Sequence, residues 1–238
     1  MKLFAKTFAL ASLSACALAS STIASAQVQG NIGTVNAARA LLQTSALQNA
    51  YNSIGTTYAA QIASLRTQSE QRQTLLKSFD TNGDNEVDDA EMAAKQGSTE
   101  FSQLETLQRN MKAQSDQIDF GKVYAIQEIY KQYPAALQEV ITSNQVQIVV
   151  APDALLYAPN EADLTPKVTA SLNTKVSAVG VVPPAGWQPT RASLQLFQEI
   201  EQTLALAQAI QARQQQAAQQ TPQVPAVAPA VPAAPVGR

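Results

Sequence analysis

The stretch 47-LQNAYNSIGTTYAAQIASL-65 decides the fold of this chain, because its apolar side chains recur with a helical period. They stand at steps of 4, 3, 4, 4 and 3 residues, on one stripe of a helix: Leu47, Tyr51, Ile54, Tyr58, Ile62 and Leu65. The other face carries Gln, Ser, Thr and Arg. No proline interrupts residues 36–79, so we expect one helix of about forty residues, weakened locally by Gly55.

A second helical run follows an acidic stretch, and its apolar residues also share a face. They stand at steps of 3, 3, 4 and 7 residues: Phe101, Leu104, Leu107, Met111 and Ile118. Both runs are long, polar over most of their circumference and separated by one short loop. This favours a helical hairpin over two core helices of a globular bundle. We therefore expect a coiled-coil arm over about residues 37–130.

The residues after the arm predict a small body. Val146–Val150 is a β-branched run typical of a buried strand, and Leu155–Tyr157 is a candidate for a second one. Pro134 predicts a break in the helix, and residues 166–172 predict a short helix that begins at a proline. The expected fold class is mainly α with a small β component: a long hairpin arm on a β-body whose strands lie near residues 31–36 and 146–157.

The N-terminus predicts export. Residues 1–26 have a basic start, a short apolar centre and small residues at Ala24 and Ala26, as in a secretory signal peptide that is cleaved after Ala26. The residues up to Cys16 also resemble a lipobox, in which Cys16 would be acylated and become the new N-terminus. Both alternatives place the protein in the periplasm. We expect no transmembrane segment in the mature chain, because no other run is apolar enough.

Composition shifts divide the rest of the chain. We expect an arm-and-body domain over residues 27–173 and a turn-rich linker over 174–192, which holds the single Trp. A Gln- and Ala-rich helix follows over 193–219. The final segment, 220–238, is rich in Pro and Ala, and we expect it to be disordered.

The composition excludes several classes of function. The 238 residues include no His and one Cys, so His-dependent triads, His-metal hydrolases and cysteine enzymes are excluded, and we expect no enzymatic activity. The 16 basic and 18 acidic residues form no basic stripe interleaved with aromatic residues. Nucleic acid is therefore not an expected partner.

The most specific motif is the acidic stretch Asp80–Glu91, which resembles an EF-hand calcium loop. Oxygen ligands fall at loop positions 1, 3, 5, 7, 9 and 12, with the backbone carbonyl serving at position 7: Asp80, Asn82, Asp84, Glu86, Asp88 and Glu91. Asn85 stands at position 6, where the sharp turn favours Gly. The alternative is an acidic turn whose Asp residues cap the following helix. The expectation is weak Ca²⁺ binding at the arm tip.

The order of these segments resembles the Skp/OmpH family of periplasmic chaperones over about residues 28–173. The resemblance is carried by Ile32–Asn36 at the first strand and Val146–Ala154 at the second. Downstream, Leu156–Tyr157 and Ala162–Thr165, running into the short helix, match the family's ending. The calcium loop would be an insertion at the hairpin tip.

The resemblance implies a jellyfish-like homotrimer whose three arms enclose a cavity for unfolded outer-membrane β-barrel proteins, held without ATP. Candidates for client contact lie on the apolar stripes: Ile54, Tyr58, Ile62, Leu65, Leu104, Leu107 and Met111. These residues are also candidates for the seam inside the hairpin, which must be buried first. The arms are near neutral, whereas family members often have strongly basic arms. The alternative function is that of a calcium-binding or structural coiled-coil protein of the envelope.

Overall fold

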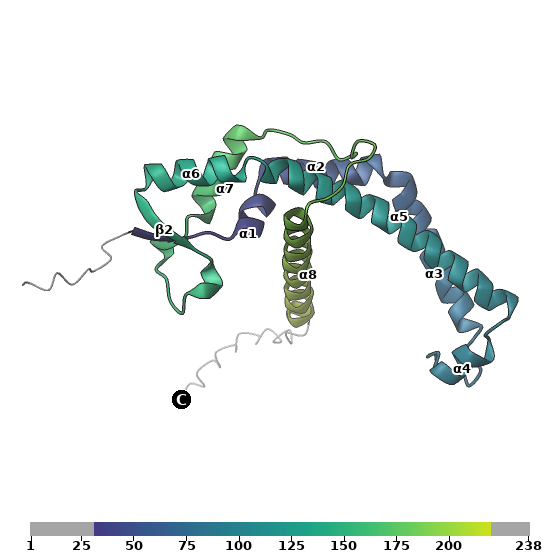
Figure 1. Cartoon of the computed structure of the whole chain (residues 1–238). Helices are drawn as coiled ribbons and strands as arrows, with labels where there is room; N and C mark the ends of the chain where they lie inside the picture. Colours follow the sequence, from purple (N-terminus) through teal and green to yellow (C-terminus); the bar gives the residue numbers. More distant parts are fainter. Residues whose placement is uncertain (1–30, 220–238) are drawn as a thin grey trace, which may run out of the picture. The chain divides into compact units, whose positions relative to one another are not determined.

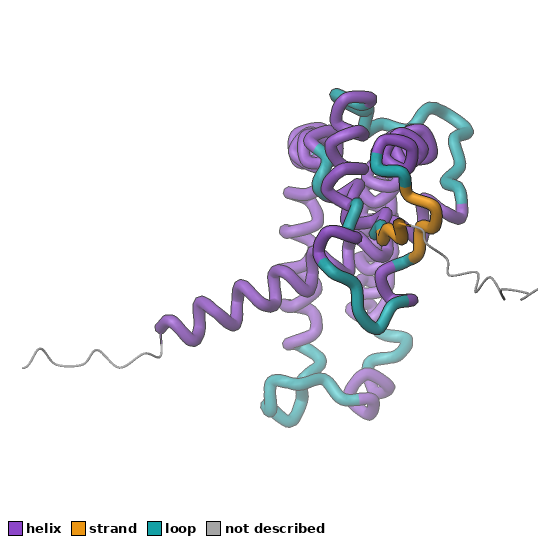
Figure 2. The backbone as a smooth tube through the Cα atoms, turned by 90° about the vertical axis from the view of Figure 1, so that its left-hand side faces the viewer, coloured by secondary structure: helices purple, strands orange, loops and turns teal. Residues whose placement is uncertain are grey.

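The computed structural model describes residues 31–219, and these residues are mainly helical (Figure 1). Figure 2 shows how small the strand component is, with two short strands among the helices. The expected fold class, mainly α with a small β component and long helices, is confirmed. The predictions for the signal peptide, Cys16 and the tail lie outside the described residues.

The sheet joins two segments that are far apart in the sequence. Strand β1 (Asn31–Thr34) pairs in parallel with β2 (Val146–Val150), with Ile32 opposite Ile148. Parallel strands need a long crossover connection, and the helical hairpin supplies it. The Thr34 carbonyl also accepts a hydrogen bond from the backbone N–H of Leu164 at 2.9 Å. The residues after β2 thus return to the same strand.

Three helices make up the body around this sheet. They are α1 (Ala37–Leu42), α6 (Tyr133–Ser143) and α7 (Thr165–Lys175), and α7 packs against both of the others. The hydroxyl of Thr169 donates to the carbonyl of Ala40 at 3.0 Å and so joins α7 to α1. The body buries the following apolar side chains: Leu41, Ala136, Val140, Leu164, Val168 and Leu172.

The hairpin arm runs outward through α2 (Ser45–Thr57) and α3 (Ala59–Lys77) and returns through α5 (Thr99–Tyr130). The short helix α4 (Asp89–Ala94) lies at its far end (Figure 1). The base of the arm is well packed, since α5 buries Ile126 and Ile129 there. Such burial stabilises a helix pair by about 1.5–3 kcal/mol per large side chain.

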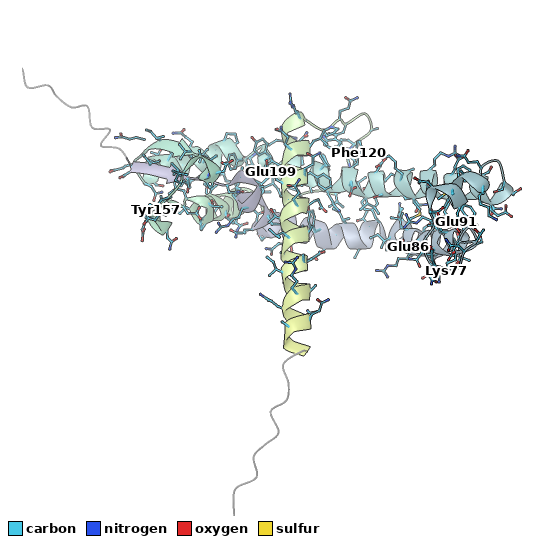
Figure 3. All side chains as sticks on the ribbon, turned by 90° about the horizontal axis from the view of Figure 1, so that it is seen from below. Lys77, Glu86, Glu91, Phe120, Tyr157 and Glu199 are labelled. Atoms are coloured by element: carbon cyan, nitrogen blue, oxygen red, sulfur yellow. The ribbon has the colours of Figure 1, made fainter. Side chains whose placement is uncertain are left out.

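The last helix, α8 (Arg191–Gln219), packs its first half against α5 and α1. Leu196 and Ile200 are buried there. From Ala205 to Ala217 every residue of the helix is exposed. Figure 3 shows α8 crossing the line of the hairpin, with Glu199 near the crossing.

The expected single helix over residues 36–79 is wrong, because the chain forms α1, α2 and α3 there. The first break lies at Thr44, whose hydroxyl accepts from the backbone N–H of Leu47 at 3.2 Å and donates to the Leu41 carbonyl at 2.6 Å. The second lies at Tyr58, which ends α2 and begins α3 with a non-helical ψ of 20°. Gly55 lies inside α2, and neither break occurs at it.

The strand considered at Leu155–Tyr157 is also wrong. The chain turns there between two 3-10 turns, Pro152–Ala154 and Asn160–Ala162. Leu156 and Tyr157 are fully or almost fully exposed, at 109% and 83%. An isolated run of apolar residues becomes a strand only when a neighbouring strand accepts its hydrogen bonds, and the described chain offers none at this point.

Candidate functional site

The arm carries the predicted client contacts, and the structure divides them into two groups. Ile54, Tyr58 and Leu104 are buried, with exposed fractions of 4%, 9% and 2%. They form the inner seam of the hairpin and are not available at the surface in this conformation. The other four are half-buried, so part of each side chain can be reached from solvent: Ile62, Leu65, Leu107 and Met111. Whether any of these residues contacts a client stays a prediction.

Tyr58 is a seam residue with a polar end. Its hydroxyl donates to the carbonyl of Val181 at 3.1 Å, a residue far along the chain. Burial raises the pKa of the Tyr58 phenol above its ordinary value of 10.0. The side chain therefore stays neutral and acts as a fixed hydrogen-bond donor at the break between α2 and α3.

A groove of about 530 Å³ opens between the outer parts of α3 and α5. Its apolar side chains are Leu75 and Leu107, both half-buried. The polar wall offers hydrogen-bond donors and acceptors and one charge: Thr67, Glu70, Gln71, Thr74 and Gln103. Leu107 is among the contacts predicted from the sequence, whereas Leu75 is not. The signal was present, since Leu75 continues the stripe from Leu65 through Gln68 and Arg72 at steps of 3, 4 and 3.

The backbone of the acidic tip turns sharply at two positions, of which the loop pattern predicts the one at Asn85. Gly83 and Asn85 have positive φ angles of 79° and 67°. Asn is one of the few residues that tolerate the left-handed conformation, which is why it can replace Gly at this position. The carboxylate of Asp80 accepts from the backbone N–H groups of Gly83 at 2.6 Å and Asn85 at 2.9 Å. These bonds wind the loop around Asp80.

The last residue of the loop, Glu91, is buried and faces the loop's own backbone. Its Oε1 accepts from the N–H and hydroxyl of Thr81, at 2.7 and 2.8 Å, and from the N–H of Asn82 at 3.1 Å. The backbone N–H of Thr81 is the main reason that the pKa of Glu91 lies below its ordinary value of 4.5. Asp88 accepts from the backbone N–H of Glu91 at 2.8 Å and completes a capping box for α4.

The predicted calcium ligands are not brought together into a cage. Asp84 accepts from the backbone N–H of Glu86 at 2.8 Å, and the Glu86 side chain is exposed. Figure 3 shows Lys77, Glu86 and Glu91 at the same end of the hairpin. Across residues 31–219, no three Asp, Glu, His or Cys side chains converge closely enough to hold a metal ion. The loop closes on its own hydrogen bonds instead.

The tip is anchored to the arm by Phe79, which is fully buried. The ammonium of Lys95 lies over its ring at 5.9 Å from the centroid. This contact joins the end of α3 to the residue that follows α4. The loop is thus held at both of its ends, by Phe79 and by the capping box.

Two comparisons bear on the chain as a whole, and a third returned nothing. A family model described as outer membrane protein (OmpH-like) matches residues 31–172. A crystal structure of a candidate outer membrane chaperone (OmpH-like) from Caulobacter crescentus CB15 aligns with a TM-score of 0.44 at 15% identity. The alignment covers 66% of this chain and 94% of that chain, and at this score it adds no independent support. A search of curated proteins returned no significant match. No helix within residues 31–219 is long and apolar enough to cross a bilayer.

Proposed function

The chain belongs to the family of OmpH-like outer membrane proteins, and we propose that it is a periplasmic holdase chaperone. Its clients would be unfolded outer-membrane β-barrel proteins, kept soluble without ATP. Family membership supports a chaperone function at the outer membrane. One observation carries the finer proposal: the groove on the outer arm, where Leu75 and Leu107 remain partly open to solvent.

The groove suits an unfolded β-barrel segment for physical reasons. Such a segment exposes alternating apolar side chains together with unpaired backbone N–H and C=O groups. Leu75 and Leu107 offer moderate apolar contact, and the side chains of Gln71 and Gln103 can both donate and accept hydrogen bonds. A shallow groove of this kind holds many sequences weakly and does not select one.

The first test measures the aggregation of an unfolded outer-membrane β-barrel protein diluted from urea. The parent chain is expected to keep the client soluble. The double variant Leu75→Gln/Leu107→Gln should lose most of this effect, because it removes the apolar floor of the groove while the helices can still form. The control is Leu206→Gln on α8, whose side chain is 63% exposed and lies away from the groove. Equal protection by both variants would contradict the groove as the client site.

We further propose that three copies assemble through the body. Two observations support this. The sheet of β1 and β2 leaves Ile32 and Ile148 at 46% and 40% exposure, and the nearby loop leaves Leu156 and Tyr157 in solvent. Exposed apolar side chains beside open strand edges are typical of an interaction surface.

Light-scattering mass tests the assembly separately from the client assay. The trimer is supported if the parent has the mass of three chains and the variant Ile148→Asp has a lower mass. A monomer or dimer with no effect on client aggregation would favour the alternative, a structural or calcium-binding protein of the envelope. A monomer that still protects clients would contradict the trimer alone.

We also propose that the Asp80–Glu91 loop binds Ca²⁺. The positive φ of Asn85 and the bonds from Gly83 and Asn85 to Asp80 support this. Because Glu91 would have to give up its hydrogen bonds with Thr81 and Asn82, we expect weak binding, with a Kd of about 10⁻⁴ to 10⁻³ M.

Calorimetry should show Ca²⁺-dependent heat in the parent and none in Glu91→Gln. Glu105→Gln, an exposed change on α5, serves as the control. No heat in the parent would rule the site out.

A further inference from the structure

The segment after α7 runs back across the base of the arm. Residues 176–190 connect α7 to α8, beyond the family match that ends at residue 172. Val176 and Val181 are buried in the same core as the base of the hairpin, with exposed fractions of 9% and 7%. This connection is therefore part of the packed structure, although the sequence predicts only a turn-rich linker.

The connection crosses α5 at a glycine and meets the arm at its break. A Cβ atom on Gly121 would lie 2.7 Å from the Val181 carbonyl oxygen and 3.1 Å from the Tyr58 ring, so no larger residue fits without displacing one of them. The same carbonyl accepts the hydrogen bond from the Tyr58 hydroxyl. The connection is thus fixed to the residue at which α2 ends and α3 begins.

An aromatic cluster holds the next part of the connection on α5. The ring of Trp187 meets Phe120 and Tyr124 edge to face, with centroids 6.1 and 5.2 Å apart. Pairs of this kind contribute about 0.5–1.5 kcal/mol beyond the area they bury. Figure 3 shows Phe120 on the hairpin between the body end, marked by Tyr157, and the tip, marked by Glu91.

Polar contacts extend this attachment to the start of α8. The side-chain oxygen of Gln127 accepts from the N–H of Thr190 and the hydroxyl of Ser193, both at 2.9 Å. The ammonium of Lys122 lies 3.1 Å from Asp119 and 3.4 Å from Glu201. Asp119 lies on α5 itself, so the contacts to the start of α8 come from residues 122 and 127 of α5.

Beyond this attachment, the outer arm buries few large apolar side chains, among them Leu104 and Phe79. Helix α3 buries no residue within the described chain. Three buried polar atoms on the outer arm have no hydrogen-bond partner in the part that the structure describes: Gln68 Oε1, Arg72 Nε and Gln114 Oε1. A segment with few buried apolar contacts opens at low free energy. The orientation of the outer arm is therefore decided at its base.

We propose that residues 176–201 form a brace that holds the base of the arm and limits the opening of its outer half at Tyr58. The brace contacts the arm at three places. Val181 packs against Gly121 and Tyr58, and Trp187 packs against Phe120 and Tyr124. The first turns of α8 form polar contacts with Gln127 and Lys122. The inference concerns the conformation of the chain and does not depend on the chaperone proposal.

The test compares two Gly→Ala changes inside helices. Gly121→Ala should push Val181 off the arm, whereas Gly55→Ala places its Cβ where nothing lies within 4 Å. Trp187 is the only Trp in the chain, so its fluorescence reports on the brace directly. In Gly121→Ala we expect a red shift of the emission and about tenfold faster amide hydrogen exchange over residues 59–77. In Gly55→Ala we expect neither.

Two results would overturn the brace. One is a red-shifted Trp187 emission with unchanged exchange over residues 59–77, and the other is an unchanged emission in Gly121→Ala. A second pair of variants applies if Gly121→Ala does not fold. Trp187→Ala should speed exchange over the same residues, and Tyr157→Ala, which removes an exposed aromatic side chain, should not. Equal exchange in this pair would also reject the proposal.

Discussion

Single side chains couple elements of this protein that the sequence keeps far apart, and Glu139 is the clearest case. It lies on α6, and its Oε2 accepts from the ammonium of Lys175 at 2.8 Å and from the hydroxyl of Ser171 at 3.0 Å, both on α7. The hydrogen bond from Lys175 is the main cause that lowers the pKa of Glu139 from its ordinary value of 4.5. No periodicity in the sequence indicates this pairing, because it arises only when α6 and α7 pack.

The pKa of Glu139 predicts a pH dependence of stability. A carboxyl group whose pKa is lowered on folding stabilises the folded state above its ordinary pKa, and this contribution is lost as the pH falls through the folded-state pKa. Between about pH 6 and pH 3, the parent should therefore lose more stability than Glu139→Gln, in urea unfolding followed by circular dichroism. Parallel curves for the two proteins would contradict a role for this charge. Because Glu139 is partly exposed, the difference should be small and should shrink in high salt.

At the scale of elements, α8 shows how one sequence pattern can serve two environments. Ile200 and Ile210 belong to the same Gln- and Ala-rich helix, yet Ile200 is fully buried against the rest of the chain and Ile210 is 47% exposed. The first half of the helix packs against α5 and α1, whereas every residue of its outer half, from residue 205 to 217, is exposed in the described chain. Helical period predicts the element, but only the position of its neighbours decides which turns are buried.

These two isoleucines give a matched prediction. Ile200→Ala should lower the free energy of unfolding by about 2–5 kcal/mol, because it leaves a cavity between α8 and α5. Ile210→Ala should change it by less than about 0.5 kcal/mol, because about half of this residue is already exposed to solvent and no closed cavity forms. Urea denaturation of both variants measures the difference. Equal losses would mean that the outer half of α8 is covered in solution.

At the scale of the whole molecule, the part of the chain outside the family match completes the fold. Val181, Leu196 and Ile200 belong to the same buried core as Leu41, and all three lie after residue 172. An OmpH-like domain cut from this chain at the end of the match would leave the base of the arm uncovered. The C-terminal extension is therefore a structural part of the arm.

A pair of truncations tests this dependence. Ending the chain after Lys175 should lower the free energy of unfolding by several kcal/mol. Each large buried side chain that is lost contributes about 2–5 kcal/mol to this decrease. Ending it after Ala205 removes only exposed turns of α8 together with the tail, so the urea midpoint should stay close to that of the parent. A stable chain ending at Lys175 would show that the extension is dispensable for folding.

By itself, the sequence determined the helical arm, its acidic tip and the strand at Val146–Val150, because helical period, β-branching and composition are local properties. It did not determine that the helix breaks at Tyr58, or that Leu155–Tyr157 forms no strand. Nor did it determine the groove at Leu75 or the brace at Trp187. Only the tertiary structure decided these, since each depends on contacts between distant residues. An apolar side chain can lie in the hairpin seam, in the groove or on the surface, and the residues that pack against it decide which.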